Sequence, residues 1–442
     1  MNIILIAIDT LRADHLDCYG YERATSPALR ALAEDGVLFE NFFAPAIPTD
    51  PSFASLFTGL PDYAHRIAGV IPPRAVPDDA PWLPDLFAEA GYHTCALDNL
   101  QGHADFFGRG WADYSWPGMG TDKEKREKRN AEIMTDAAVE LMERLPDDDP
   151  SFVFLHYWDP HTPYFPPGPY DGLYYEGDPT DARHDSMRKC RAQGSPGVGW
   201  IDSEVTDADY VVAQYDAEIA YNGEHLWRLF DALKERGLYD DALIVAFSDH
   251  GEVLTGHEGA FDHHGLYDAN LHVPLIMKLP GQERAGERVR GMVQMTDLPL
   301  TLLERAGLAV PEPMEGADLL EMGPDPEDGP HEELFLAEGT WQVKRGVRTR
   351  EWKFIRAASD TYEHNWHGTA PKELYNLRDD PDEQGNLIHL EPEVAAELEG
   401  RLDAWLEQMK ARCGWSDPLI EDGPTLLKDF SERKVTPAED IV

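Results

Sequence analysis

Two runs of apolar residues that each lead into a carboxylate constrain the fold more than any other feature of the sequence. Residues 3–8 contain only Ile, Leu and Ala and run directly into Asp9, while residues 243–247 are followed within one residue by Asp249 and His250. Such runs are typical of strands buried in a parallel sheet. Ligands bind at the carboxyl ends of strands in open α/β sheets. We therefore expect Asp9, Asp249 and His250 to share one sheet edge.

Apolar runs alternate with helical patterns along most of the chain, as in an α/β fold with a largely parallel sheet. Further strands are expected at residues 93–97, 152–157 and 273–278. Helices are expected at residues 27–34 with Ser26 as N-cap, and at 55–59, 82–90, 122–145 and 206–236. Residues 166–200 are rich in Pro, Gly, Asp and Tyr and predict a long loop.

A Pro/Gly/Asp stretch near residue 325 predicts a domain boundary. Beyond it, alternating segments at residues 333–337, 342–348 and 352–356 indicate a small antiparallel sheet, followed by a helix at 392–412 and a polar tail. The expected fold class is therefore α/β: a large, mostly parallel sheet flanked by helices in residues 1–325, with a small C-terminal subdomain of antiparallel sheet plus helix in residues 326–442.

The net charge of −45 argues against nucleic-acid binding, which requires a basic surface. Acidic residues are spread along the whole chain and lysines are few, which is typical of proteins adapted to concentrated salt. A halophilic source is our hypothesis, and an acidic protein without salt adaptation is the alternative.

The four cysteines form no CxxC pair and read as free thiols of a reducing compartment. The N-terminal apolar run of six residues has no basic segment before it and is too short to cross a membrane. We therefore expect a cytoplasmic protein without a membrane partner. Whether it forms a homo-oligomer stays open.

Three further segments place polar side chains where they can complete a site with the strand ends. Thr49 precedes a helical segment, where backbone N–H groups favour anions. Its hydroxyl can serve as a nucleophile, or simply cap the helix. His161 follows a buried strand, and a glycine-rich stretch after Asp249 contains His257, His263 and His264. These imidazoles can contact an anion or protonate a leaving group, or be ordinary loop histidines.

In order and spacing, these segments resemble the sulfatase family of the alkaline-phosphatase-like superfamily. Residues 9–15 resemble the N-terminal metal motif, and residues 49–59 resemble the signature Cys/Ser-x-Pro-x-Arg-x-x-x-x-Thr-Gly. Residues 160–164 are similar to the Pro-His-x-Pro-Tyr element, and residues 248–252 to Ser-Asp-His-Gly-Glu. Residues 373–377 resemble part of the C-terminal subdomain, so the resemblance covers nearly the whole chain.

The sequence departs from the family pattern at four positions. Thr49 occupies the position that the family oxidises to formylglycine, and threonine cannot become an aldehyde hydrate. Phe53 replaces the arginine of the signature, Thr10 replaces a second aspartate, and His263 replaces a lysine. Threonine resembles instead the phosphodiesterases and phosphotransferases of the superfamily, which attack with an alkoxide.

The resemblance implies one divalent cation, Ca²⁺, Mn²⁺ or Zn²⁺. Its implied ligands are Asp9, Thr49, Asp249 and His250. The implied nucleophile is Thr49, the implied leaving-group acid is His257 or His263, and the implied substrate contacts are His161, His264 and Arg12. An internal ion pair is the alternative for Arg12, and a helix cap is the alternative for each aspartate.

The resemblance therefore implies a metal-dependent hydrolase of small anionic esters. Threonine favours phosphate mono- or diesters over sulfate esters, because a sulfo-threonine has no hemiacetal route by which to expel sulfate. A phosphodiesterase or phosphonate monoester hydrolase is one alternative. A non-catalytic sulfatase-like binding protein is another, since two signature residues are replaced.

Overall fold

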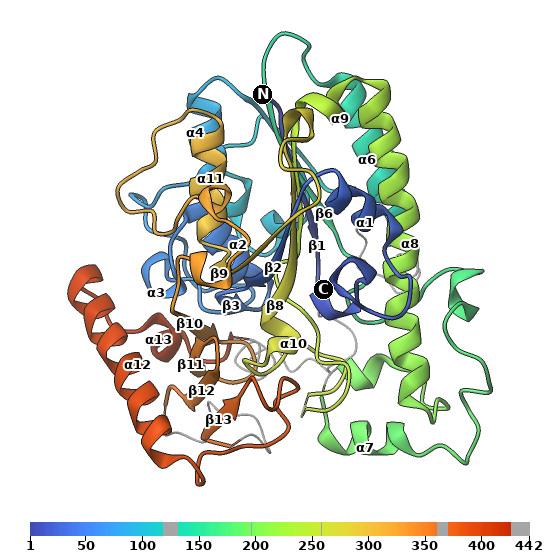
Figure 1. Ribbon diagram of the computed structural model, residues 1–442, viewed down its shortest axis with the longest axis vertical. Coiled ribbons are helices and arrows are strands. Elements are labelled where there is room, and N and C mark those ends of the chain that lie inside the picture. The colour runs from blue at the N-terminus through green and yellow to red at the C-terminus, as the bar shows by residue number, and fades with distance from the viewer. Residues whose placement is uncertain (118–130, 196, 258, 360–369, 426–442) are drawn as a thin grey trace.

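A computed structural model describes residues 1–117, 131–195, 197–257, 259–359 and 370–425 (Figure 1). The first part of the helix expected at residues 122–145 and the polar tail after residue 428 lie outside the described residues.

The main sheet has eight strands in the order β5-β4-β6-β1-β7-β8-β2-β9. All neighbours pair in parallel except β8, which runs antiparallel to both β7 and β2. This confirms the expected α/β class with a mostly parallel sheet. The strands are β1 (Ile3–Ile8), β2 (Val37–Phe43), β4 (His93–Leu97), β5 (Asp113–Ser115), β6 (Ser151–Tyr157), β7 (Leu243–Phe247), β8 (His272–Lys278) and β9 (Glu287–Gln294).

Helices cover both faces of this sheet, because alternate residues of its central strands point to opposite sides (Figure 1). Ile4, Ile6 and Ile8 pack with α1 (Pro27–Glu34), α6 (Ala131–Arg144) and α8 (Ala208–Glu235). Ile3, Leu5 and Ala7 pack with α2 (Thr49–Thr58), α4 (Leu83–Glu89) and α11 (Asp297–Arg305). The central strands are therefore buried on both sides, which explains their continuous apolar runs.

The C-terminal sheet has five strands in the order β13-β12-β11-β10-β3. Four of them form an antiparallel meander: β10 (Glu333–Glu338), β11 (Lys344–Thr349), β12 (Trp352–Ala357) and β13 (Lys372–Asn376). The fifth, β3 (Ala46–Ile47), comes from the N-terminal half and pairs in parallel with β10. The helix α12 (Pro392–Cys413) packs on the meander, as Figure 1 shows. The boundary near residue 325 stays a prediction.

Two expectations about local structure were wrong. Residues 166–200 are not one irregular loop, since they contain α7 (Ser186–Gln193) and two short 3₁₀ turns. The helix expected at residues 55–59 begins at Thr49, because proline is tolerated in a first helical turn and Pro51 does not break it. Ser26 is the N-cap residue of α1, as expected, although its hydroxyl donates to Asp17 and not to the helix backbone.

The short remaining helices are α3 (Asp62–His65), α9 (Leu238–Asp241), α10 (Asp268–Leu271) and α13 (Pro418–Asp422). Among the described residues, no helix combines the length and apolar character needed to cross a bilayer.

Candidate active site

Asp9, Asp249 and His250, which we call the metal cluster, meet at the carboxyl ends of β1 and β7. These strands are parallel neighbours, with Ala7 opposite Phe247, so the residues that follow each strand emerge side by side. Each of the three side chains offers a ligand atom, and those atoms lie within 4.8 Å of one another. All three residues are fully buried. The sheet topology thus brings together groups about 240 positions apart in the sequence.

The hydrogen bond of His250 Nδ1 leaves Nε2 as the ring atom that can bind a metal. Its Nδ1 lies 2.9 Å from the carbonyl oxygen of Gly251, which can only accept, so Nδ1 carries the hydrogen. In the neutral ring, Nε2 then directs its lone pair toward the carboxylates. This is the usual tautomer arrangement of a metal-binding histidine.

Distances within the metal cluster fit a shared ion better than hydrogen bonds. His250 Nε2 lies 3.8 Å from Asp9 Oδ1 and 3.5 Å from Asp249 Oδ2. Both exceed a good hydrogen bond, whereas ligand atoms around one Zn²⁺ or Ca²⁺ are separated by roughly 3–4 Å. The donor set of two carboxylates and an imidazole therefore fits a divalent cation.

The two carboxylates are poorly compensated without a cation. Both oxygens of Asp249 and Oδ1 of Asp9 are buried and accept no hydrogen bond from the described residues. Burial and the neighbouring charge of Asp9 raise the pKa of Asp249 to about 6. The pKa of Asp9 is lowered despite burial, chiefly because His156 donates a hydrogen bond to it. Buried charges of this kind are normally paired or bound to metal.

Thr49 stands at the first position of α2, next to the metal cluster. Its Oγ1 lies 3.2 Å from His250 Nε2, and the residue is only 4 % exposed. One turn later, Ser52 donates to the backbone oxygen of Asp249 and fixes the helix against β7. The hydroxyl is therefore held where a cation bound by the cluster would reach it.

His156 is a buried site residue that the sequence analysis missed. It lies within β6, opposite Ala7 of β1, with Nδ1 2.9 Å from Asp98 and Nε2 3.3 Å from Asp9. Burial opposes its charge, but the two carboxylates raise the pKa of His156 to about 10. Its ring packs edge-on against Phe53, 4.8 Å between centroids. A histidine inside an otherwise apolar strand run was the available signal.

His161 and His263 both lie beside the metal cluster. The ring of His263 is 4.8 Å from that of His250 and 5.3 Å from that of His161. Burial lowers the pKa of His161, whose Nδ1 donates to the carbonyl of Thr162. Burial disfavours charge on His263 as well, but Glu252 and Asp262 outweigh it and raise the pKa of His263 to about 9.

His264 lies next to His263, between two carboxylates. Its Nε2 lies 3.1 Å from Asp262, and its Nδ1 lies 3.7 Å from Glu338. Both carboxylates raise the pKa of His264 against the effect of burial. This position suits a residue that orients Asp262 more than one that contacts a substrate.

His257 and Arg12 line a hollow of about 540 Å³. The ring of His257 stacks on Tyr267 at 3.8 Å, and burial lowers the pKa of His257 to about 4. Arg12 donates twice to Asp14 and once to the backbone oxygen of Glu252. The ion pair that was the alternative for Arg12 is therefore present.

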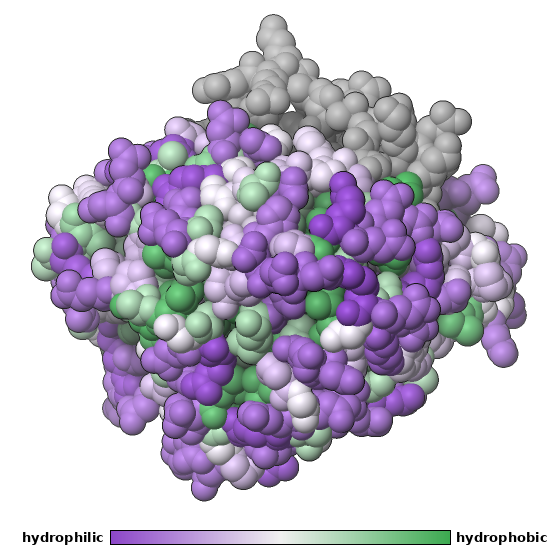
Figure 2. Space-filling model, turned by 90° about the horizontal axis from the view of Figure 1, so that it is seen from above, coloured by the Kyte–Doolittle hydropathy of each residue, from purple (hydrophilic) through white to green (hydrophobic). Residues whose placement is uncertain are grey.

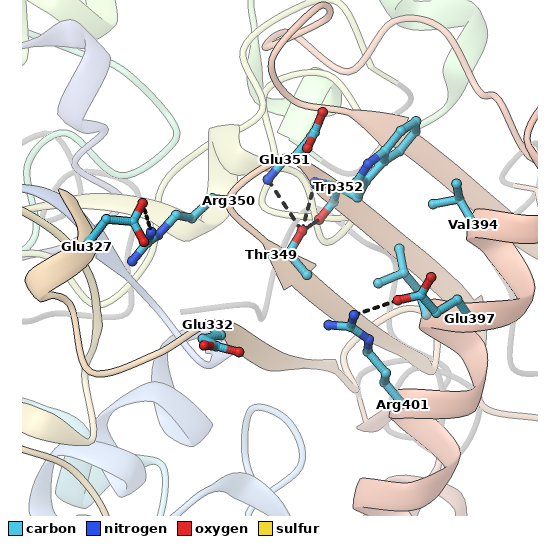
Figure 3. A pocket seen from close by; sticks show the side chains of 10 residues that line it. Glu327, Glu332, Thr349, Arg350, Glu351, Trp352, Val394, Glu397 and Arg401 are labelled. Atoms are coloured by element: carbon cyan, nitrogen blue, oxygen red, sulfur yellow. Dashed lines mark hydrogen bonds and ion pairs between the residues drawn. The ribbon is translucent and has the colours of Figure 1, made fainter.

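A further cavity of about 410 Å³ lies in the C-terminal subdomain (Figure 3). Figure 3 shows Arg350 paired with Glu327, and Arg401 paired with Glu397 beside the turn that carries Trp352. Both arginines along this cavity thus already have carboxylate partners. Among the residues that line this cavity there is no group of buried, uncompensated carboxylates like that of the metal cluster.

Comparison with known proteins decides the family. The profile described as Sulfatase matches residues 1–308, and that described as N-sulphoglucosamine sulphohydrolase, C-terminal, matches residues 256–412. The chain belongs to the sulfatase family. Sulfatase relatives are ester hydrolases, and enzymes of the alkaline phosphatase superfamily use a divalent metal.

Individual relatives agree with this assignment. An N-acetylglucosamine-6-O-sulfatase of Bacteroides thetaiotaomicron is 24% identical, over 88% of this chain and 82% of the relative. A multifunctional alkaline phosphatase superfamily protein of Trinickia caryophylli is 26% identical, over 87% of this chain and 91% of the relative. The crystal structure of a phosphonate monoester hydrolase of Agrobacterium radiobacter superposes with a TM-score of 0.73 at 21% identity, over 92% of this chain and 96% of that one. This last likeness shows the shared fold.

Proposed function

We propose that this sulfatase-family chain hydrolyses small sulfate or phosphate esters with Thr49 as nucleophile, and that phosphate esters are the better substrates. The observation that carries the proposal is the placement of Thr49 Oγ1, 3.2 Å from His250 Nε2, beside two buried carboxylates with three oxygens that accept no hydrogen bond from the described residues. Asp9, Asp249, His250 and Thr49 would hold one divalent cation. Because an imidazole is among the ligands, Mn²⁺ and Zn²⁺ are as suitable as Ca²⁺.

A cation held by Asp9, Asp249, His250 and Thr49 would lower the pKa of the Thr49 hydroxyl and offset charge on the ester oxygens. In the first step, Thr49 Oγ loses its proton to solvent and forms a bond to phosphorus as the bond to the ester oxygen breaks. The ester oxygen leaves with the electron pair and takes a proton from His263. In the second step, water attacks phosphorus, and Thr49 Oγ leaves and takes one of the water protons. Phosphate keeps the other, and His263 regains its proton from solvent.

Between the two histidines proposed as leaving-group acid, the contacts favour His263. Its ring lies beside those of His250 and His161, whereas His257 stacks on Tyr267. With Nδ1 toward Glu252 and Asp262, the opposite nitrogen of His263 is left for the ester. His161 is proposed to hydrogen-bond an ester oxygen, and Arg12 and His264 to support the site from outside it.

The test is a panel of an aryl sulfate, a phosphate monoester, a phosphodiester and a phosphonate monoester, each with added Ca²⁺, Mn²⁺ or Zn²⁺. On the best substrate, Thr49→Ala should lower kcat/KM by at least about 10³-fold, since covalent catalysis needs the hydroxyl. Its stability should fall by only about 1 kcal/mol. Thr49→Ser should keep part of the activity. A loss below about tenfold in Thr49→Ala would instead favour a water nucleophile.

We also propose that the chain works in concentrated salt within a reducing compartment. The charge of −45 and the largely hydrophilic face in Figure 2 support the first part, and four free cysteines support the second. Screening of repulsion between acidic side chains should raise the melting temperature steeply from low to molar NaCl. A melting temperature that stays flat or falls over that range would reject salt adaptation.

A further inference from the structure

His156 is the middle member of a row of three side chains that neighbouring strands bring together. The strands β4, β6 and β1 lie side by side in this order, and Asp98 and Asp9 are the first residues after β4 and β1. His156 lies between them, with Nδ1 2.9 Å from Asp98 Oδ1 and Nε2 3.3 Å from Asp9 Oδ2. All three residues are buried. The row thus runs from β4 directly to the metal cluster.

Both ring nitrogens of His156 face carboxylate oxygens. Ionised carboxylates only accept hydrogen bonds, so each nitrogen donates and the ring carries a positive charge. One buried cation therefore separates two buried anions, which offsets the cost of burying all three. Asp98 Oδ2 also accepts from the backbone N–H of Leu100 and from the hydroxyl of Tyr114. Asp98 is thereby fixed, and it holds the imidazole in one orientation.

The two oxygens of Asp9 face different neighbours. Oδ2 receives the hydrogen bond of His156, whereas Oδ1 accepts none from the described residues and lies 3.8 Å from His250 Nε2. The ligand atoms of the metal cluster come from Asp9, Asp249 and His250, and His156 is not in this group. His156 therefore lies behind the carboxylate, where a hydrogen-bond donor orients a metal ligand without binding the metal itself.

The side chain at position 53 touches the same imidazole. Phe53 lies in α2 one turn after Thr49 and is fully buried. Its ring packs edge-on against His156, 4.8 Å between centroids, and against Phe154 at 5.5 Å. An arginine that began at position 53 would extend into the space that the imidazole now fills. The arginine missing from α2 and the cation present in β6 therefore concern one place in the fold.

We propose that His156 is a positioning residue that supplies from β6 the positive charge that position 53 lacks, and that it orients Asp9 toward the bound metal. Asp98 anchors the ring for this purpose. This role rests on the proposed metal site but not on Thr49 being the nucleophile. It also explains why Phe53 suits this chain, because a second cation at position 53 would meet the imidazolium. The positive charge has moved from the helix to the strand.

The experiment is a double-mutant cycle at positions 53 and 156, read out as the Kd for Mn²⁺. Full-length protein is stripped with EDTA, dialysed and titrated with MnCl₂ by isothermal titration calorimetry. His156→Ala should raise the Kd about 10- to 100-fold, as expected when the support behind a metal ligand is lost. Phe53→Arg in the His156→Ala background should lower the Kd again by at least about fivefold, because a guanidinium is always charged and can enter the vacated space.

Phe53→Arg should therefore have opposite effects in the two backgrounds. In the wild type it should raise the Kd, since it brings a second cation against the imidazolium and overfills a packed place. Two controls accompany the cycle. Phe53→Met with His156→Ala fills space without charge and should not restore the Kd. His331→Leu removes a histidine that binds the buried Asp297, outside the metal cluster, and should leave the Kd unchanged.

Tight binding by the wild type with an unchanged Kd in His156→Ala would overturn the positioning role and leave the proposed function standing. A Kd that Phe53→Arg does not restore would also overturn it, as would equal restoration by Phe53→Met, because His156 would then act as a ligand or as packing. A wild type that binds no Mn²⁺ would overturn the proposed metal site and the positioning role together. If circular dichroism shows that His156→Ala is unfolded, His156→Ser takes its place with the same expected results.

Discussion

Two buried regions of this protein each hold several charged side chains, but they differ in whether those charges are paired with opposite charges. Where α10 meets the C-terminal sheet, Lys353 lies 2.6 Å from Asp268 and 2.7 Å from Glu383, and Arg348 binds Asp268 at 2.8 Å. Two cations thus balance two anions. In the metal cluster, by contrast, two buried carboxylates face each other and three of their four oxygens accept no hydrogen bond from the described residues.

The difference separates a structural charge network from a chemical site. A buried ion pair can be kept where two parts of a fold pack together, because each member compensates the other. Buried acids without such compensation destabilise the chain unless a ligand completes them. The lack of compensation, more than burial, therefore distinguishes the metal cluster as the proposed place of chemistry.

The largest expected effect concerns Lys353 at the interface. Lys353→Met should lower the free energy of unfolding by about 3–5 kcal/mol, because it leaves Asp268 and Glu383 buried with one cation fewer. The control Lys372→Met, whose half-exposed side chain pairs with Glu399, should cost less than about 1 kcal/mol. Urea unfolding measures both. Equal losses in the two variants would break the comparison.

A smaller effect of opposite sign is expected in the metal cluster. Since burial and Asp9 raise the pKa of Asp249 to about 6, its ionised form opposes folding increasingly as pH rises from about 4 to 6. At pH 8 with EDTA, Asp249→Asn should therefore be as stable as the wild type or up to about 2 kcal/mol more stable. Added metal should then stabilise the wild type but not the variant.

Asp297→Asn serves as the matched control for that experiment. Asp297 is equally buried but accepts hydrogen bonds from two backbone N–H groups and contacts His331. Asp297→Asn should lower the free energy of unfolding by about 1–3 kcal/mol, with or without metal. If Asp249→Asn is destabilised as much as Asp297→Asn in EDTA, the metal cluster is a structural network after all.

The smallest expected effect tests whether His257 belongs to the charge network around Lys353 or to the surroundings of the metal cluster. Its pKa is lowered to about 4, chiefly by burial and then by the charge of Lys353, so the folded state holds fewer protons there than the unfolded state. The stability that neutral His257 contributes is present above about pH 6.5 and is lost as pH falls toward 4. We expect His257→Gln to remove about 1 kcal/mol of this acid-induced loss in the free energy of unfolding. A fully buried ring would contribute more, at about 1.4 kcal/mol per pKa unit, but the ring of His257 is partly exposed.

The same variant should keep kcat/KM within tenfold at pH 8, since His257 stacks on Tyr267 and not on the metal cluster. A hundredfold loss of activity would move His257 into the site and remove His263 as the sole candidate for leaving-group acid.

Strand ends and motif order predicted the class of the fold and the residues that meet at its edge, because parallel neighbours deliver their last residues to one place. The sequence did not reveal β2 or β9, whose mixed residues give no continuous apolar run. It also missed His156, since the role of this residue depends on which side chains face it across the sheet. Such contacts join residues far apart in sequence and carry no local pattern.

The pairing of β3 with β10 has a consequence for how the protein is made. Two residues before Thr49, Ile47 pairs with Glu338, so the segment that leads into α2 is part of the C-terminal sheet. A nascent chain must emerge to about residue 338 before this segment finds its neighbour. The proposed reactivity of Thr49 toward anionic esters would therefore depend on a strand that is synthesised long after the segment that leads into α2.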